Sequence, residues 1–449
     1  MNDQQKKSKY EIDMCNGSLL DKLIAFSIPL MLSGILQLLF NAVDIIVVGQ
    51  YTGSNALAAV GSTTALINVF VNLFIGISLG ANVLAARYYA AGQEKEMSET
   101  VHTAITLALI SGMMMAVIGI ALAKGALTLM DTPADVLPLA TLYMRIYFIG
   151  MPFFMLYNYG AAILRAVGDT RRPLFFLVIS GLINVVLNLV LVRQFHMGVA
   201  GVAIATVISQ FVSCVLVLRC LITSKSSYQL HIAKLGMKAC YVKQIFKVGI
   251  PAGIQSVIIN FSNVLLQSSV NAFGYLAMAG YTAANNILGF LYASVNAITQ
   301  ACMSFTSQNY SVGKYKRMDR ILLECLGLTV TISLILGGGS YLFGHTLLHI
   351  YTKSADVVAC GMDIMLYTTV TYFLCGIMDL IPGAMRGMGH STVPMLLSVI
   401  GTVGTRIVWI YLVFPYHRTL DFLFISYPVS WLLTIVMQVI CFYFVRKRR

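Results

Sequence analysis

Long apolar stretches of about 20 residues alternate with short polar stretches from Leu23 to the end of the chain. A helix of about 20 apolar residues is long enough to cross the hydrocarbon core of a bilayer, which is about 30 Å thick. The sequence therefore predicts an all-α integral membrane protein. Twelve transmembrane helices are expected, at residues 23–48, 57–82, 101–123, 137–159, 174–194, 198–222, 245–272, 276–302, 321–343, 360–383, 393–414 and 421–445.

Composition supports this class. Hydrophobic residues make up 58% of the 449 positions and charged residues 10%, whereas soluble domains carry about 25% charged residues. The first apolar stretch follows a long polar segment and lacks a small-residue cleavage site, so we expect a retained helix and no signal peptide. An ordinary soluble domain is excluded.

The basic residues are distributed unevenly between the two sides of the predicted membrane. If the N-terminus is cytoplasmic, 24 of the 30 Lys and Arg residues lie in inside segments, 4 lie in outside loops, and Arg145 and Arg406 lie within helices. The positive-inside rule favours this orientation. We therefore expect a multi-pass plasma-membrane protein with both termini in the cytoplasm. The net charge of +13 then reflects topology, and no nucleic-acid partner is expected.

The two halves of the chain repeat each other at an offset of about 221 residues. The motif at 165–173 recurs at 386–394, the motif at 89–92 recurs at 310–313, and Ser-Ile-Pro at 27–29 is answered by Gly-Ile-Pro at 249–251. Since each half contains six helices, the repeat is parallel and its pseudo-two-fold axis lies along the membrane normal. The predicted parts are a cytoplasmic tail at 1–22, an N-lobe at 23–222, a cytoplasmic linker at 223–244, a C-lobe at 245–445 and a basic tail at 446–449.

The sequence lacks the common motifs of enzymes and of nucleotide-driven pumps. The sequence contains no GxxxxGK[ST], HExxH or GxSxG motif, and its nine cysteines are scattered without a CxxC pair. We expect neither an enzyme nor a cofactor. Transport without a nucleotide site draws on an ion gradient, which predicts a secondary transporter.

Carboxylates within the predicted membrane helices are the most informative polar residues, because burying such a charge is costly and usually marks an ion pathway. Only Asp44 and Asp379 lie well inside apolar stretches. Ser33, Gln37, Asn41 and Asp44 share one face of the first helix at spacings of four, four and three. Helix packing is an equal alternative for Ser33 and Gln37, whereas Asp44 requires a partner, a proton or a cation.

Possible partners of Asp44 lie on the fifth and sixth helices. Asn184 and Asn188 share a helix face, and Thr206 follows on the next helix. Amide and hydroxyl oxygens beside one carboxylate suit a hard cation or a proton.

Each of the other polar positions within the predicted helices has two interpretations. The stripe of Asn260, Asn263, Gln267 and Asn271 on the seventh helix predicts the wall of a solvated substrate cavity as readily as an ion role. Asp379 is a candidate for a second coupling role or for contact with substrate charge. Arg145 and Arg406 are expected to extend to the membrane interface rather than to act as gates.

The order of motifs resembles the multidrug and toxic compound extrusion (MATE) family, bacterial type, over essentially the whole chain. The resemblance rests on Pro29, Asn41-Ala-Val-Asp44 through Gly49, the stretch 56–61, Arg165-Ala-Val-Gly168, Asn184-Val-Val-Leu-Asn188, the stretch 198–206 and Met385-Arg-Gly-Met-Gly389.

Membership would imply two six-helix lobes around a central cleft, and export of lipophilic or cationic compounds in exchange for Na⁺ or H⁺. It would assign ion coupling to Asp44, Asn184, Asn188, Thr206 and Tyr143, with Na⁺ held by the first three. It would place Gln37, Asn41, Asn260, Asn263, Gln267 and Asp379 in the substrate cavity.

The C-lobe departs from the pattern of the family. One branch uses an acid where this chain has Ile259, and a second acid about one turn before Asp379. We therefore expect ion coupling mainly in the N-lobe.

Two rivals remain. One is a lipid-linked oligosaccharide flippase of the same superfamily, although such flippases often carry a strongly cationic cavity. The other is a non-transporting receptor or channel. The expected partners are small organic cations or drugs and membrane lipids, and the expected state is a monomer.

Overall fold

The computed structural model describes residues 10–447, apart from the side chains of residues 54 and 65, and in this part of the chain only helices and their connections occur. The predicted segments 1–22 and 446–449 lie partly outside the described residues. The long helices of the first half are α1 (Leu20–Tyr51), α2 (Ser54–Ala90), α3 (Glu94–Leu129), α4 (Leu137–Ile149), α5 (Met151–Ala166), α6 (Arg171–Asn188) and α7 (Gly198–Thr223).

The second half repeats this order. Its long helices are α8 (Ala239–Asn271), α9 (Tyr275–Ser311), α10 (Tyr315–Leu342), α12 (Ala355–Thr368), α13 (Tyr372–Gly387) and α17 (Ser426–Lys447). Shorter elements are α11 (Gly344–His349), α14 (Thr392–Ser398), α15 (Thr405–Val408) and α16 (Leu420–Phe424). The π-helical segments are η1 (Leu189–Gln194), η3 (Val399–Gly404) and η4 (Trp409–Val413), and the 3₁₀ turns are η2 (Ile232–Lys234) and η5 (Phe414–Tyr416).

The expected all-α membrane fold is confirmed. Ten helices of the described chain are long and apolar enough to cross a membrane, and the number rises to twelve when the bent pairs α4–α5 and α12–α13 each count as one span. The helices that were expected to be continuous at 137–159 and 360–383 therefore bend, by 46° and 44°.

The two bends have different causes. Between α4 and α5, Pro152 has no N–H to donate to the preceding turn, and the helix restarts at Met151. Between α12 and α13, the hydroxyls of Thr368, Thr369 and Thr371 donate to carbonyls four residues earlier. Such bonds compete with the backbone ladder and bend helices.

The internal repeat is visible in the element bounds. Adding 221 to the bounds of α2 and α5 gives the bounds of α9 and α13, and adding 221 to the starts of α3 and α6 gives the starts of α10 and α14. Gly168 and Gly389, at equivalent places after α5 and α13, both have φ near +90° (96° and 86°). Only glycine adopts this conformation without strain, which explains why both copies of the motif keep it.

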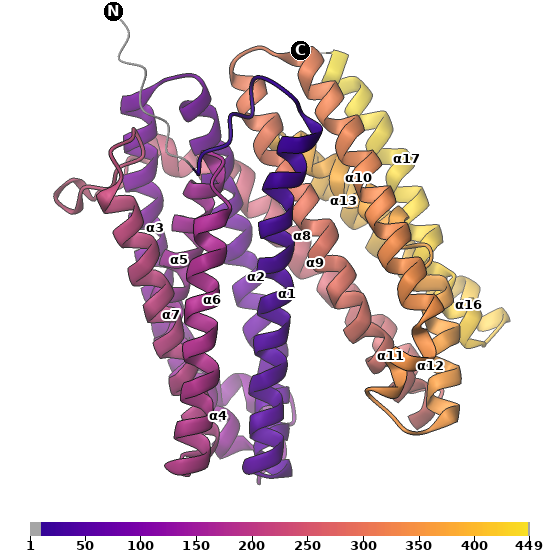
Figure 1. The fold of residues 1–449 in the computed structure, drawn as a ribbon. Helices are drawn as coiled ribbons and strands as arrows, with labels where there is room; N and C mark the ends of the chain where they lie inside the picture. The colour runs from indigo at the N-terminus through magenta and orange to yellow at the C-terminus, as the bar shows by residue number, and fades with distance from the viewer. Residues whose placement is uncertain (1–9, 448–449) are drawn as a thin grey trace, which may run out of the picture. The chain divides into compact units, whose positions relative to one another are not determined.

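The chain packs as two compact units that differ in extent from the predicted lobes. Unit 1 holds Ile35–Gly253 and the N-terminal segment up to Asp13, and unit 2 holds Met14–Gly34 and the chain from Ile254 onward. The first part of α1 thus belongs to unit 2, and the first part of α8 to unit 1. Within unit 1, α5 packs against α2, α3 and α7, and within unit 2, α13 packs against α9, α10 and α17 (Figure 1).

In α6 the apolar side chains face outward and the polar side chains face inward, which is the reverse of the arrangement in a soluble protein. Its large apolar side chains at Phe175, Leu182 and Val186 are about 60% exposed, at 62%, 60% and 59%. On the opposite face, Ser180, Asn184 and Asn188 recur every four residues and are buried. Lipid accommodates the apolar face, so polar side chains collect inside the bundle, where they bond to neighbouring helices.

A polar network closes the end of unit 1 where α2 ends and α6 begins. Arg172 is ion-paired with Asp169, and its Nη2 donates to the Tyr228 hydroxyl at 3.3 Å. Tyr228 and Tyr89 each donate to the Glu11 carboxylate at 2.8 Å. Burial raises the pKa of Asp169, although Arg172 beside it favours the charged form. The network joins the N-terminal segment and the linker to this end of unit 1.

Candidate functional site

Asp44 of α1 meets Asn188, the last residue of α6, inside unit 1. The Asn188 Nδ2 group donates to Asp44 Oδ1, and also to Asn184 Oδ1 at 3.1 Å. An amide nitrogen carries two hydrogens, so both are used. The Asn188 Oδ1 oxygen is buried and has no hydrogen-bond partner among the described residues. A buried acceptor without a donor is unusual, and here it lies beside a carboxylate.

Thr206 of α7 completes the cluster. Asn184 Nδ2 lies 3.5 Å from the Thr206 hydroxyl, which donates to the Val202 carbonyl at 3.0 Å and also faces the Asp44 carboxylate. The one hydroxyl proton of Thr206 has two acceptors within reach, the Val202 carbonyl and the Asp44 carboxylate, and the hydroxyl oxygen accepts from Asn184. Three helices therefore converge on one group of carboxylate, amide and hydroxyl oxygens. The structure brings together Asp44 and its three expected neighbours, Asn184, Asn188 and Thr206.

Close packing of α1 on α6 sets this geometry. Gly181, two turns before Asn188, lies directly against the ring of Phe40, one turn before Asp44, and a Cβ atom at position 181 would overlap that ring. Directly after Asn188, the chain changes to the π-helical segment η1. Such π-segments are frequent at functional sites, because they shift the direction of neighbouring side chains.

This contact gives a first prediction. Gly181→Ala forces the Phe40 ring to move, and overpacking of this kind typically costs about 1–3 kcal/mol. We expect lower thermal stability in detergent and a weaker Asp44–Asn188 contact, measured as reduced transport. Gly125→Ala is the control, since a Cβ there meets no atom within 4 Å. Partial recovery in Gly181→Ala/Phe40→Leu is expected, and an unaffected Gly181→Ala protein would show that this contact does not position the site.

Aromatic side chains of α4 border the cluster. The buried Tyr143 and the half-buried Tyr147 stack with ring centroids 6.1 Å apart, and both lie close enough to Asp44 to interact with its charge. Tyr143 is among the residues expected from the sequence, whereas Tyr147 and its neighbour Gln210 are not. Tyr147 follows Tyr143 by four residues, so its position on the same helix face was a usable signal. Gln210 likewise follows Thr206 by four.

The residues expected to line a substrate cavity have varied surroundings. Gln37, Asn41 and Asn260 are exposed. In unit 2, Gln267 donates to Asn271 at 3.0 Å, so these two side chains are hydrogen-bonded to each other along α8. Ser33 donates to the Pro29 carbonyl at 2.8 Å, which fits the packing reading of that residue. The cavity assignment stays a prediction.

Asp379 lies half-buried in α13 and interacts electrostatically with Arg386, two turns later on the same helix. Arg386 is buried and donates from Nη2 to Gln255 Oε1 at 2.7 Å. Asp379 thus has a basic side chain in its electrostatic surroundings, although neither Asp379 nor Asp44 has a basic partner within ion-pair distance among the described residues.

The oxygen cluster is not repeated in unit 2. At the offset of 221, the counterparts of Asp44, Asn184, Asn188 and Thr206 are Leu265, Thr405, Trp409 and Tyr427. Arg406 lies over the Tyr427 ring, with its guanidinium carbon 4.3 Å from the ring centroid, and donates to Asn263 Oδ1 at 2.9 Å. The expectation that Arg406 extends to the interface is wrong, because this side chain is 3% exposed. A cation–π contact and an amide oxygen hold its charge inside.

The donor set of the cluster limits its chemistry. In the described part of the chain, no group of three or more His, Cys, Asp and Glu side chains is placed to hold a metal ion. One carboxylate with neutral oxygens is instead the donor set of a hard monovalent cation or of a proton. An α-helical bundle of twelve spans, built as a tandem repeat with one such cluster, defines a polytopic membrane transporter.

Comparison with known proteins places this transporter in a family. The MatE family model matches residues 29–190 and 251–412, so both halves match and the chain belongs to the MatE family. It is a transporter and not an enzyme. The two matches begin 222 residues apart, in agreement with the internal repeat.

Individual relatives are similar to this chain over most of its length. The chain is 27% identical to the probable multidrug resistance protein YoeA of Bacillus subtilis, covering 99% of this chain and 96% of YoeA. It is 24% identical to the probable multidrug resistance protein NorM of Thermotoga maritima, over 86% and 84% of the two chains. The solved outward-facing structure of a multidrug resistance MATE family transporter superposes with a TM-score of 0.91, at 20% identity and 99% coverage of both chains.

Proposed function

We propose that this protein exports lipophilic or cationic compounds from the cell by antiport with Na⁺ or H⁺, and that the ion binds at Asp44. The observation that carries the proposal is that Asn188 donates from Nδ2 to the Asp44 carboxylate while its buried Oδ1 oxygen has no partner among the described residues. A cation or a protonated carboxyl group at this place supplies the missing partner of that oxygen. The names of the relatives, which describe multidrug resistance proteins, support the substrate class.

The proposed mechanism is alternating access. Cargo enters from the cytoplasm, the protein changes to its outward-open form, and ion binding at Asp44 favours release of the cargo. Cargo and ion need no shared site, because coupling requires only that each binds the two conformations with different affinity.

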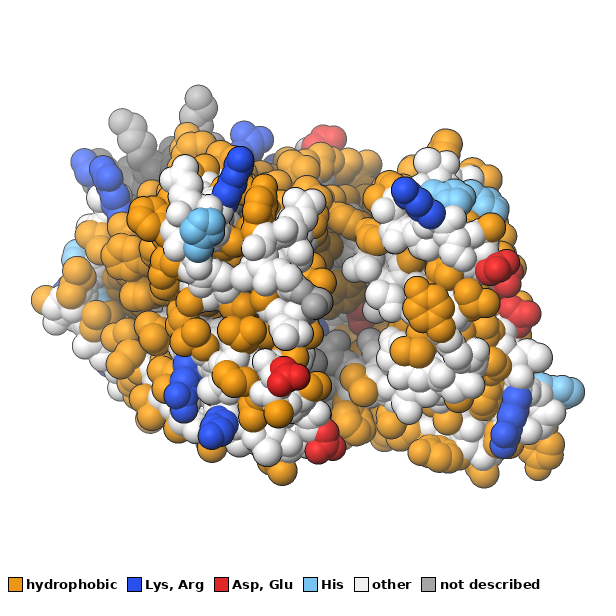
Figure 2. Space-filling model, turned by 90° about the horizontal axis from the view of Figure 1, so that it is seen from below, with side chains coloured by type: hydrophobic (Ala, Val, Ile, Leu, Met, Phe, Trp, Pro, Cys, Tyr) orange, Lys and Arg blue, Asp and Glu red, His pale blue; other side chains and the backbone are white. Residues whose placement is uncertain are grey.

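The proposed setting is the plasma membrane, with both termini cytoplasmic and the protein acting as a monomer. The charge distribution supports this orientation, since 24 of the 30 basic residues fall on the side of the termini. On the face seen in Figure 2, Lys and Arg side chains are scattered among hydrophobic and uncharged groups, with Asp and Glu side chains also present. This face fits the outer side of the membrane.

The proposal is tested with purified protein in lipid vesicles that are loaded with a fluorescent cationic drug. A Na⁺ gradient is applied without a pH gradient, and the reverse is applied in a parallel sample. We expect one of the two gradients to accelerate efflux of the drug relative to protein-free vesicles. Efflux that responds to neither gradient would contradict the antiporter assignment.

A further inference from the structure

The segment that joins α7 to α8 carries apolar side chains on its surface, although it lies between two membrane-spanning helices. Ile232, Leu235 and Met237 are 66%, 39% and 48% exposed. Met237 and the first two turns of α8 line an open pocket of about 490 Å³. Its walls are Ala239, Val242, Phe246 and the stem of Lys243. This size is within the usual range of small-ligand sites.

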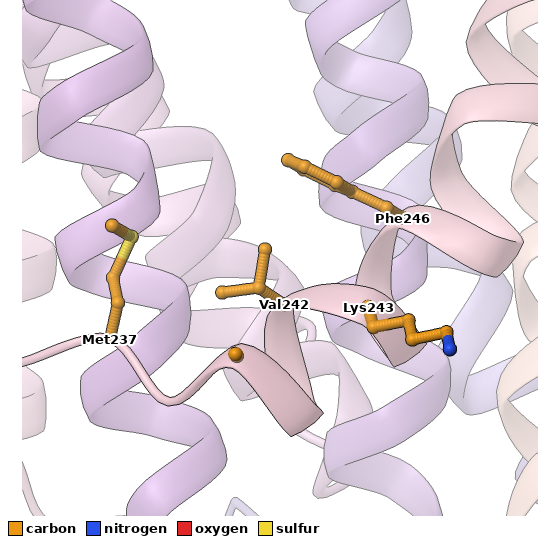
Figure 3. Close-up of a pocket in the computed structure, with 5 residues that line it drawn as sticks. Met237, Val242, Lys243 and Phe246 are labelled. Atoms are coloured by element: carbon orange, nitrogen blue, oxygen red, sulfur yellow. The ribbon is translucent and has the colours of Figure 1, made fainter.

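Helical spacing gives the start of α8 two neighbouring faces. Val242 and Phe246, four residues apart, form the apolar wall, and Lys243 and Lys247, also four apart, form a basic ridge beside it. Figure 3 shows Met237 on the loop before α8, with Val242 and Phe246 extending from the helix and the Lys243 ammonium directed away from Met237. An apolar groove thus borders two exposed lysines.

Neither lysine has a carboxylate partner in an ion pair among the described residues. The sequence contains no Asp or Glu between Asp169 and Asp319. Glu99 of α3, which approaches the linker, is already ion-paired with Lys238. The first turn of α8 also lacks an acidic residue, so the positive end of the helix dipole adds to their field.

We propose that this groove binds an anionic phospholipid, with the headgroup against Lys243 and Lys247 and one acyl chain along Met237, Val242 and Phe246. A basic ridge next to exposed apolar side chains, at the end of membrane-spanning helices, is the arrangement of an interfacial lipid site. A lipid supplies both halves of the match, an acyl chain for the groove and a negative charge for the lysines. A protein partner would account for the exposed apolar surface, but not for its location at the membrane surface.

Native mass spectrometry of the full-length, delipidated protein in detergent tests this site. Dioleoyl phosphatidylglycerol and dioleoyl phosphatidylcholine, which share their acyl chains, are titrated separately. Each lysine near an anionic headgroup is expected to contribute about fivefold in affinity. We expect the wild type to bind phosphatidylglycerol at least about tenfold more tightly than phosphatidylcholine, and Lys243→Gln/Lys247→Gln to lose most of this preference.

Two further variants separate the parts of the site. Met237→Gln is expected to weaken binding of both lipids alike, because it alters the acyl groove and leaves the lysines in place. Lys124→Gln/Lys353→Gln removes two exposed lysines elsewhere and is expected to keep the wild-type preference. Thermal unfolding of each variant checks that the fold is retained.

The proposal is overturned by equal wild-type affinity for the two lipids, or by the same loss of preference in the Lys124/Lys353 control. It is also overturned if Met237→Gln abolishes a protein dimer seen in the spectra and changes no lipid binding. In that case the apolar surface serves contact between two copies of the chain.

Discussion

Replacing Asp44 by Asn is expected to abolish ion-driven drug efflux while the protein still reaches the membrane in normal amounts. The asparagine side chain has nearly the same shape and keeps an oxygen that accepts from Asn188 Nδ2, so the helix contact is preserved. What is lost is the negative charge that attracts a cation and the carboxyl group that takes up a proton. Removing a half-buried charge also relieves part of its desolvation cost, so we expect no loss of thermal stability.

The measurement is efflux from vesicles under the more effective of the two gradients, with thermal unfolding recorded in parallel. Asp21→Asn is the matched control, because Asp21 lies on the same helix in an exposed position of its first turn. Efflux of Asp44→Asn is expected to match protein-free vesicles, whereas Asp21→Asn transports normally. Undiminished gradient-driven efflux in Asp44→Asn would remove Asp44 from the coupling site.

Replacing Asn188 by Leu is expected to weaken ion binding by about ten- to a hundredfold. The variant removes the unpartnered Oδ1 oxygen that we propose as a ligand of the ion. A polar contact with a charged group typically contributes about 1.5–3 kcal/mol. The measured quantity is the ion concentration that gives half-maximal efflux. Asn286→Leu, at an exposed asparagine of α9, is expected to leave this concentration unchanged.

The Asn188→Asp variant tests whether the side chain at position 188 contacts the coupling ion. Two carboxylates in contact cannot both be ionised near neutral pH, so one of them takes up a proton. We expect efflux by this variant to depend more steeply on pH than efflux by the wild type. The same pH profile in both proteins would indicate that position 188 does not contact the ion.

The sequence predicted the cluster because each of its residues left a local signal. Asp44 was the clearest acid inside an apolar stretch, and Asn184 and Asn188 share a helix face. Spacing within a helix reports one face of that helix, but it does not report which face of another helix lies opposite. The Gly181–Phe40 contact, which sets the distance between α1 and α6, depends on the packing of two helices about 140 residues apart in sequence, and no local pattern reveals it.

Arg406 is a second case in which the local sequence does not report which helices pack around a residue. A basic residue in an apolar stretch is ordinarily expected to reach for the interface. Its burial over Tyr427 depends on α17 and on Asn263 of α8, which are distant in sequence. Hydropathy does not predict the bends at Pro152 and at Thr368–Thr371, because it measures composition and does not register a missing N–H or a competing hydroxyl.

The asymmetry between the two repeats limits the energy available for export. If the cluster in unit 1 is the one place where an ion binds, each cycle exchanges one ion for one molecule of cargo. Exchange of a monovalent drug cation for one Na⁺ or H⁺ then moves no net charge, and the membrane voltage does no work. A tenfold ion gradient supplies about 1.4 kcal/mol and supports at most a tenfold gradient of such a drug. For an uncharged compound, a voltage of 100 mV adds about 2.3 kcal/mol, so neutral cargo would be concentrated further than cationic cargo.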